Sequence, residues 1–103
     1  MISPIVNALN ESLEKLNKFE AENFLGKLQP VFYQSKMNLY LAIKELMKDT
    51  DELKRLQNKA YLVDNKNYDE LVNNVQNKAV KDYLSLYIKF GREFKANWSK
   101  GVK

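Results

Sequence analysis

The sequence predicts an all-α fold, a small antiparallel bundle of about four helices in which the last helix is long or broken. Apolar side chains recur along most of the chain at the three-to-four-residue spacing of an amphipathic helix. The 103 residues include only three glycines and two prolines, too few for the many turns of an all-β fold. A chain of this length forms one domain, so we expect a single helical domain over residues 1–103.

The first predicted helix spans residues 4–22. Ser3 and Pro4 combine a side-chain cap with a proline at the first helical position. At about 100° per residue, the following apolar residues fall in one stripe: Ile5, Leu9, Leu13, Leu16 and Phe19. Glu20 would rotate onto this stripe, so we expect the helix to fray or bend after about residue 20 and to end at Gly26.

The second predicted helix spans residues 30–48 and opens at Pro30. Its apolar face is formed by Val31, Phe32, Leu39, Ala42, Ile43 and Leu46, and is widened by Tyr40 and Met47. Met37 and Leu41 lie beyond the edge of this face. A helix that is this broadly apolar is either central in a bundle or offers a second face to a partner. We therefore predict that Met37 and Leu41 are exposed contact residues.

A third helix is predicted over residues 51–62. The acidic cluster that precedes it, Asp49-Thr50-Asp51-Glu52, is interpreted as a helix cap rather than a divalent-cation site, because no second acidic cluster with suitable spacing exists. Loop residues 64–67 follow this helix. Asn67 and Glu70 then form a variant of the capping box, which opens the fourth helix.

The fourth predicted helix spans residues 68–98. Its roughly 30 residues would extend about 45 Å, against about 28 Å for the second helix. We therefore expect it to break near Gly91 or around residues 79–82, or else to project beyond the bundle.

The composition removes most catalytic chemistry. The chain has no cysteine and no histidine, which excludes disulfides, zinc sites of the Cys/His type, and both Ser-His-Asp and Cys-His nucleophiles. The sequence also lacks a glycine-rich phosphate loop and a metal-binding helix motif. We therefore expect a non-enzymatic protein, without a cofactor or metal site, that acts by binding.

The location of the protein follows from similar exclusions. No apolar stretch approaches the roughly 18 residues of a membrane span, so no transmembrane segment is predicted. The N-terminal residues lack the basic and apolar regions of a signal peptide. We expect an intracellular protein, in the cytoplasm, an organellar matrix or a virion.

The formal net charge of +4 is confined to the last quarter of the chain. Residues 1–80 contain 11 basic and 11 acidic side chains, whereas residues 81–103 contain six basic and two acidic ones. On a helical projection the six basic residues fall within an arc of about 140°. They are Lys81, Lys89, Arg92, Lys95, Lys100 and Lys103. Such a local excess of one sign attracts an oppositely charged partner.

An aromatic stripe lies on the opposite side of the same helix and comprises Tyr83, Tyr87, Phe90, Phe94 and Trp98. The simplest interpretation is a core stripe opposite a solvated face. If the basic face is functional, it most readily fits an acidic protein surface. Nucleic acid is the second alternative. Base stacking is disfavoured, because it needs aromatic rings on the same side as the cations, so contact with phosphates is the mode that remains. Peripheral membrane contact is the third.

The sequence therefore predicts an adaptor, an inhibitor or an accessory subunit of a larger assembly, acting through protein–protein contact. Nucleic-acid binding through phosphates is the alternative function. Ile88 projects among the basic residues and would mark the contact surface if it is exposed. The predicted partner-binding residues are Lys89, Arg92, Lys95, Lys100, Lys103, Ile88, Met37 and Leu41.

Overall fold

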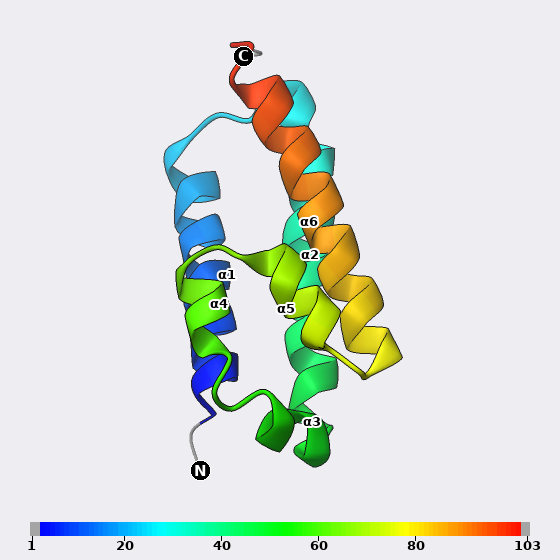
Figure 1. Ribbon diagram of the computed structural model, residues 1–103. Coiled ribbons are helices and arrows are strands. Elements are labelled where there is room, and N and C mark those ends of the chain that lie inside the picture. The colour runs from blue at the N-terminus through cyan, green and yellow to red at the C-terminus, as the bar shows by residue number, and fades with distance from the viewer. Residues whose placement is uncertain (1–2, 102–103) are drawn as a thin grey trace.

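A computed structural model describes residues 3–101, which form six α-helices and one 3-10 helix. Their bounds are α1 (Pro4–Glu22), η1 (Gly26–Leu28), α2 (Gln29–Met47), α3 (Thr50–Arg55), α4 (Ala60–Asp64), α5 (Tyr68–Asn74) and α6 (Lys78–Trp98). The long helices α1, α2 and α6 extend along the molecule, which measures 43 × 22 × 22 Å (Figure 1). We call the end that carries α3 the lower end. The all-α prediction is confirmed for the described residues, with six α-helices in place of about four.

Helix α1 begins as predicted but ends earlier than Gly26. The hydroxyl of Ser3 accepts a hydrogen bond of 3.4 Å from the backbone N–H of Val6. The helix ends at Glu22 because its C-cap, Asn23, has an extended backbone. Gly26 lies beyond this point, where its φ of +55° lets the chain turn into η1.

Glu20 does not fray the helix, contrary to expectation, because partners from the next segment hold its carboxylate. Lys36 of α2 donates to one carboxylate oxygen at 2.5 Å, and the side-chain amide of Gln29 donates to the other. The Lys36 ammonium, followed by the Gln29 amide, holds the pKa of the Glu20 carboxyl below its ordinary value. The charge that seemed to conflict with the apolar stripe therefore joins α1 to α2.

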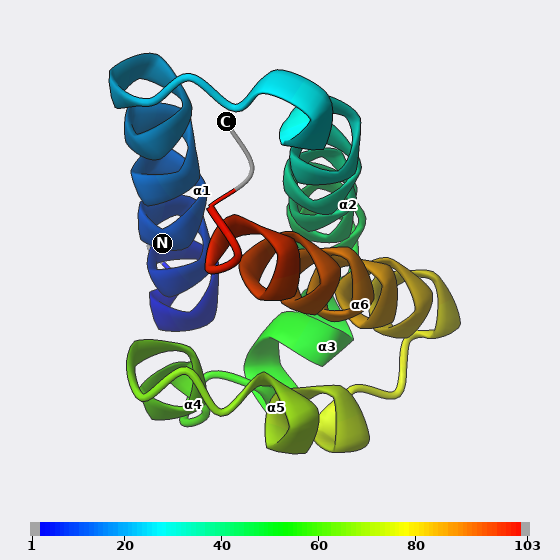
Figure 2. The same ribbon diagram turned by 90° about the horizontal axis from the view of Figure 1, so that it is seen from above.

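Helices α2 and α6 form the most extensive contact, and α6 lies between α2 and α5 (Figure 2). Gly91 lies within α6, where glycine ordinarily costs about 1 kcal/mol relative to alanine. A Cβ atom at Gly91 would lie 3.3 Å from Ser35 Oγ, which donates a 2.9 Å hydrogen bond to the carbonyl of Tyr87. Gly91 therefore permits close packing on α2, and the expected break near this residue is wrong.

The buried residues form two clusters. The larger one joins all six α-helices, and its largest fully buried side chains are Ile5, Leu9, Leu39, Leu46, Leu56, Leu62, Leu71, Leu84 and Val80. The second lies at the upper end and contains Leu25, Leu28, Phe32 and Phe94. The rings of Phe19, Phe32, Phe94 and Trp98 meet there at centroid distances between 5.0 and 5.9 Å, and we call them the aromatic cluster.

The predicted third helix is divided into α3 and α4. The predicted cap is confirmed, because the Asp49 carboxylate accepts a 3.0 Å hydrogen bond from the backbone N–H of Glu52. On one continuous helix, Leu56 and Leu62 would point about 120° apart. The turn between α3 and α4 allows both side chains to be buried in the same core.

The predicted fourth helix breaks at residues 75–77, earlier than either expected position. The Glu52 carboxylate is buried and accepts hydrogen bonds from the backbone N–H groups of Gln76 (2.7 Å) and Asn77 (2.5 Å). Its other oxygen accepts from Nε of Arg55 at 2.8 Å. The Asn77 side chain then caps α6 by accepting from Val80 N at 3.0 Å. We call these contacts the Glu52 network; they hold α5 and α6 apart as separate helices.

Candidate functional site

A groove of about 750 Å³ lies between α1 and α6, above the connection between α4 and α5. Helix α2 contributes Phe32 and Ser35 to its lining. The α1 side is lined by Ala8, Glu11, Ser12, Lys15, Leu16 and Phe19. The α6 side is lined by Tyr87, Ile88, Gly91, Arg92, Phe94, Lys95 and Trp98. We call this feature the α1/α6 groove.

Aromatic side chains lie toward both ends of the groove. At the upper end, the ring of Phe19 meets the ring of Trp98 at 5.4 Å and an interplanar angle of 70°. At the lower end, the hydroxyls of Tyr68 and Ser12 share a hydrogen bond of 2.9 Å, and the rings of Tyr68 and Tyr87 meet edge to face. Burial, with Tyr68 alongside, raises the pKa of the Tyr87 phenol far above its usual range, so this phenol stays neutral.

Small residues line part of the groove. Ala8 and Ser12 lie four residues apart on α1, and Gly91 lies on α6. Residues four apart share one face of a helix, so α1 presents two short side chains toward the lower part of the groove.

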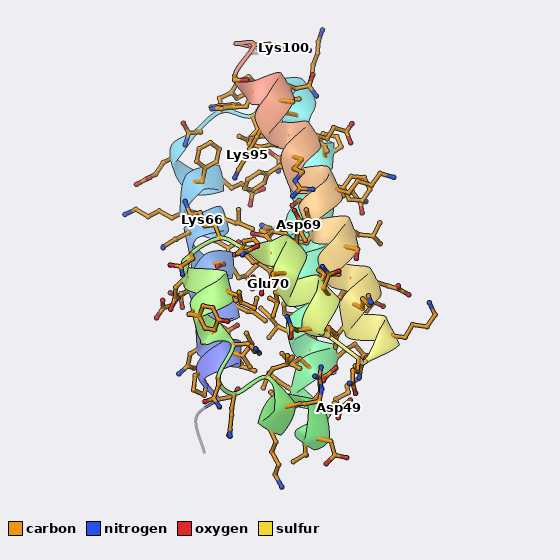
Figure 3. The ribbon with its side chains drawn as sticks, viewed as in Figure 1. Asp49, Lys66, Asp69, Glu70, Lys95 and Lys100 are labelled. Carbon is orange, nitrogen blue, oxygen red and sulfur yellow. The ribbon has the colours of Figure 1, made fainter. Side chains whose placement is uncertain are left out.

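Basic side chains outnumber acidic ones in the lining: Lys15, Lys66, Arg92 and Lys95 against Glu11 and Asp64. Within residues 3–101, the three lysines of this set form no ion pair. Arg92 pairs with Asp69 of α5 at 2.5 Å, and both side chains are about two-thirds exposed. In Figure 3, Lys66 and Asp69 lie near the α4–α5 connection, and Lys95 lies above them on α6.

Lys66 occupies a backbone conformation that lysine rarely adopts. Its φ is +58°, and it follows α4 at a position where glycine or asparagine is usual. The N–H groups of Lys66 and Asn67 donate to the carbonyls of Val63 and Leu62, the pattern of a Schellman motif. A lysine here costs up to about 1 kcal/mol relative to glycine. Its presence in the groove lining is consistent with a use for its charge.

The structure brings together three of the predicted partner-binding residues. Ile88, Arg92 and Lys95 all line the α1/α6 groove, on the flank of α6 where the basic and aromatic stripes meet. Ile88 is half-buried rather than exposed. Lys89 and Lys100 are exposed but lie outside the groove lining, and Lys103 lies outside the described residues.

Two further predicted residues, Met37 and Leu41, are half-buried, and neither lines the groove. Leu41 follows the buried Asn38 by one turn on the same side of α2, which accounts for its partial burial. The exposed apolar residues of α2 are instead Tyr33, Tyr40 and Met47, spaced seven residues apart. The expectation that Tyr40 and Met47 widen the core face is wrong, because that face turns toward solvent.

Several groove residues were not predicted as site residues. Glu11 and Lys15 of α1 were not singled out in the sequence, and Lys66 was predicted only as part of loop residues 64–67. The spacing of Ala8 and Ser12, two small residues four apart on one helix face, is the sequence signal that could have indicated a groove beside α1. No sequence pattern marked Lys66 as a groove residue, because its place in the lining depends on how α4 and α5 pack.

Two further observations concern the described part of the chain. Residues 3–101 contain no cluster of three or more Asp or Glu side chains placed to hold a metal ion. None of the helices in this range combines the length and the apolar character needed to cross a membrane. Comparisons with protein-family models, curated proteins and solved structures found no match to this chain.

Proposed function

We propose that this protein is a non-enzymatic binding protein that holds an acidic surface of a partner protein in and around the α1/α6 groove. Its role would be that of an adaptor, an inhibitor or an accessory subunit. One observation carries the proposal: Ile88, Arg92 and Lys95 line the groove together, so an apolar contact lies beside two cations. Ile88 is half-buried and belongs to neither core cluster, so the exposed part of its side chain is available to a partner in the groove.

The arrangement suits association in two stages. Cations on the rim speed the encounter with an acidic surface, and apolar contacts in the groove then slow dissociation. Lys95 has no anionic partner within the described residues, so it can bind one without first breaking a contact. Arg92 would exchange an exposed pair with Asp69, and such pairs contribute less than about 1 kcal/mol.

A pair of matched double variants tests the proposal. Arg92→Glu/Lys95→Glu reverses two charges that line the groove, and Lys89→Glu/Lys100→Glu reverses two exposed charges outside it. Both variants change the net charge by the same amount. Affinity isolation from the native source should recover an acidic protein with the wild type and with the second variant, and lose it with the first.

Nuclease treatment and salt separate the proposal from phosphate binding. A protein partner should survive nuclease, and added salt should mainly slow its association. Release by nuclease, with an affinity that falls log-linearly with salt, would show that nucleic acid is the partner. Equal loss of the partner with both double variants would mean that net basicity, and not the groove, is responsible.

A further inference from the structure

We infer that the α1/α6 groove receives one amphipathic α-helix of the partner, with its apolar face inward and acidic residues along its flanks. The inference rests on the proposed function and adds the shape and chemistry of the segment that is bound. It is carried by the length, open side, walls and charge of the groove.

The length of the groove fits about three turns of helix. Its lining runs from Ala8 to Phe19 along α1 and from Tyr87 to Trp98 along α6. Each run covers eleven steps, or about 16 Å at a rise of 1.5 Å per residue. Because both long walls are helices, a bound segment lies along the groove rather than across it.

The groove is open to solvent along one side rather than enclosed. A helix with side chains is about 10–12 Å wide. A helix lying in the groove would therefore bury one face against the lining and leave its other face in solvent. A segment that is apolar on one side and polar on the other meets both environments.

The walls of the groove favour a helix over an extended segment. A bound strand gains its affinity from main-chain hydrogen bonds to a sheet edge. The long walls here are the helices α1 and α6, whose interior N–H and C=O groups are paired within each helix. They offer side-chain contacts, which are the contacts used when an amphipathic helix lies in a groove.

The packing of the short helices shows how such a helix would lie. Lower in the molecule, α4 packs against α1 and α5 packs against α6, and together they cover that part of the α1/α6 face (Figure 1). The groove begins where this cover ends. A partner helix would continue the same layer toward the upper end, next to Lys66.

The charges set the flanks of the bound helix. Lys15 lies on the α1 side, Lys95 on the α6 side and Lys66 at the lower end of the lining. A helix with acidic residues on both flanks of its apolar face would therefore meet a cation on each side. Glu11 and Asp64, in the same lining, would repel acidic flanks, but the four basic side chains of the lining outnumber them.

A designed peptide tests the inference directly. The probe is a capped amphipathic peptide of about 14 residues, or about 21 Å as a helix, with leucines on one face and glutamates on both flanks. A control peptide replaces the glutamates with lysines. Titration into ¹⁵N-labelled protein should give saturable shifts of the amides of α1 and α6 that line the groove. The acidic peptide should bind at least tenfold more tightly than the basic one.

Two variants of α6 locate the contact. Ile88→Glu places a negative charge in the groove lining, and Leu86→Glu makes the same kind of change at a side chain that is 37% exposed and outside the lining. The first should weaken binding at least tenfold and the second less than twofold. Amide spectra of both free variants check that the fold is retained.

Four outcomes would overturn the inference. Shifts confined to Tyr33, Tyr40 and Met47 of α2 would place the docking surface elsewhere. Equal binding of both peptides would remove the charge argument. Saturable binding of oleate in the groove without any binding of the acidic peptide would identify a small anionic amphiphile as the occupant. If no peptide binds but Arg92→Glu/Lys95→Glu still loses the native partner, the inference fails while the proposed function stands.

Discussion

The Glu52 network at the lower end and the α1/α6 groove use their charged groups in opposite ways. At the lower end, the carboxylate of Glu52 is buried and committed to Arg55 and to the backbone of residues 76 and 77. In the upper part, Lys15 and Lys95 line a groove and form no ion pair within the described chain. Charges that are used to hold the fold together are unavailable to a partner. The comparison therefore supports a structural role for the Glu52 network and favours the groove as the proposed binding site.

The largest expected effect concerns the aromatic cluster, which should hold the upper end together without a partner. Phe94→Ala should lower the free energy of unfolding by about 3 kcal/mol, because the ring is 7% exposed and contacts three other rings. Phe90→Ala, at a half-buried ring of the same helix, should cost roughly half as much. Urea denaturation measures both. An equal loss for the two variants would mean that Phe94 is not packed more deeply than Phe90.

The next effect concerns the Glu52 network. Glu52→Ala should cost about 2–3 kcal/mol, because it leaves the N–H groups of Gln76 and Asn77 without their acceptor. Glu11→Ala, in the groove lining, should change stability by less than about 0.5 kcal/mol. Hydrogen exchange at residues 76 and 77 should accelerate in the Glu52 variant alone. If Glu11→Ala costs as much, the two regions do not differ as claimed.

Lys66 follows α4 and lines the lower end of the groove. Its replacement should have opposite effects on the stability of the protein and on peptide binding. Lys66→Gly should raise the free energy of unfolding by up to about 1 kcal/mol, because glycine adopts a φ of +58° without strain. The same change should weaken binding of the acidic peptide two- to threefold through the loss of one rim cation. Thermal denaturation and a peptide titration measure the two effects. A variant that is destabilised, or that binds the peptide as tightly as the wild type, would contradict this account.

The smallest effect is a pH dependence that arises at Glu20. Its pKa is lower in the folded state, so its contribution to stability is present above the ordinary value of 4.5 and is lost as pH falls through the lowered value. Glu20→Gln should therefore cost up to about 1 kcal/mol at pH 7, with the difference vanishing near pH 2. Urea denaturation at several pH values measures this. A difference that persists at pH 2 would mean that charge pairing with Lys36 is not the cause.

The sequence predicted the features that depend on local signals. The all-α class, the start of α1 at Ser3 and the cap at Asp49 follow from residue spacing and capping chemistry, and all three are confirmed. The clustering of charge on the last helix was also visible in the sequence. These features need only residues within one or two helical turns of each other.

The features that the sequence did not predict depend on contacts between distant residues. The break at residues 75–77 is fixed by Glu52, more than twenty residues earlier in the chain. The apolar spacing of Val72, Val75 and Ala79 concealed it, although Asn77 is a good helix cap. The groove likewise required knowledge of where α1 lies relative to α6. Its α6 side was predicted through Ile88, Arg92 and Lys95, whereas its α1 side was not.

The central claim is that charge complementarity in the α1/α6 groove selects the partner, and a charge swap tests it most directly. The measurement is the affinity of Lys15→Glu/Lys95→Glu for the acidic and the basic peptide, by isothermal titration calorimetry at low salt. The account predicts that the preference inverts, with the basic peptide bound more tightly by the variant and the acidic peptide by the wild type. An unchanged preference for the acidic peptide would contradict it.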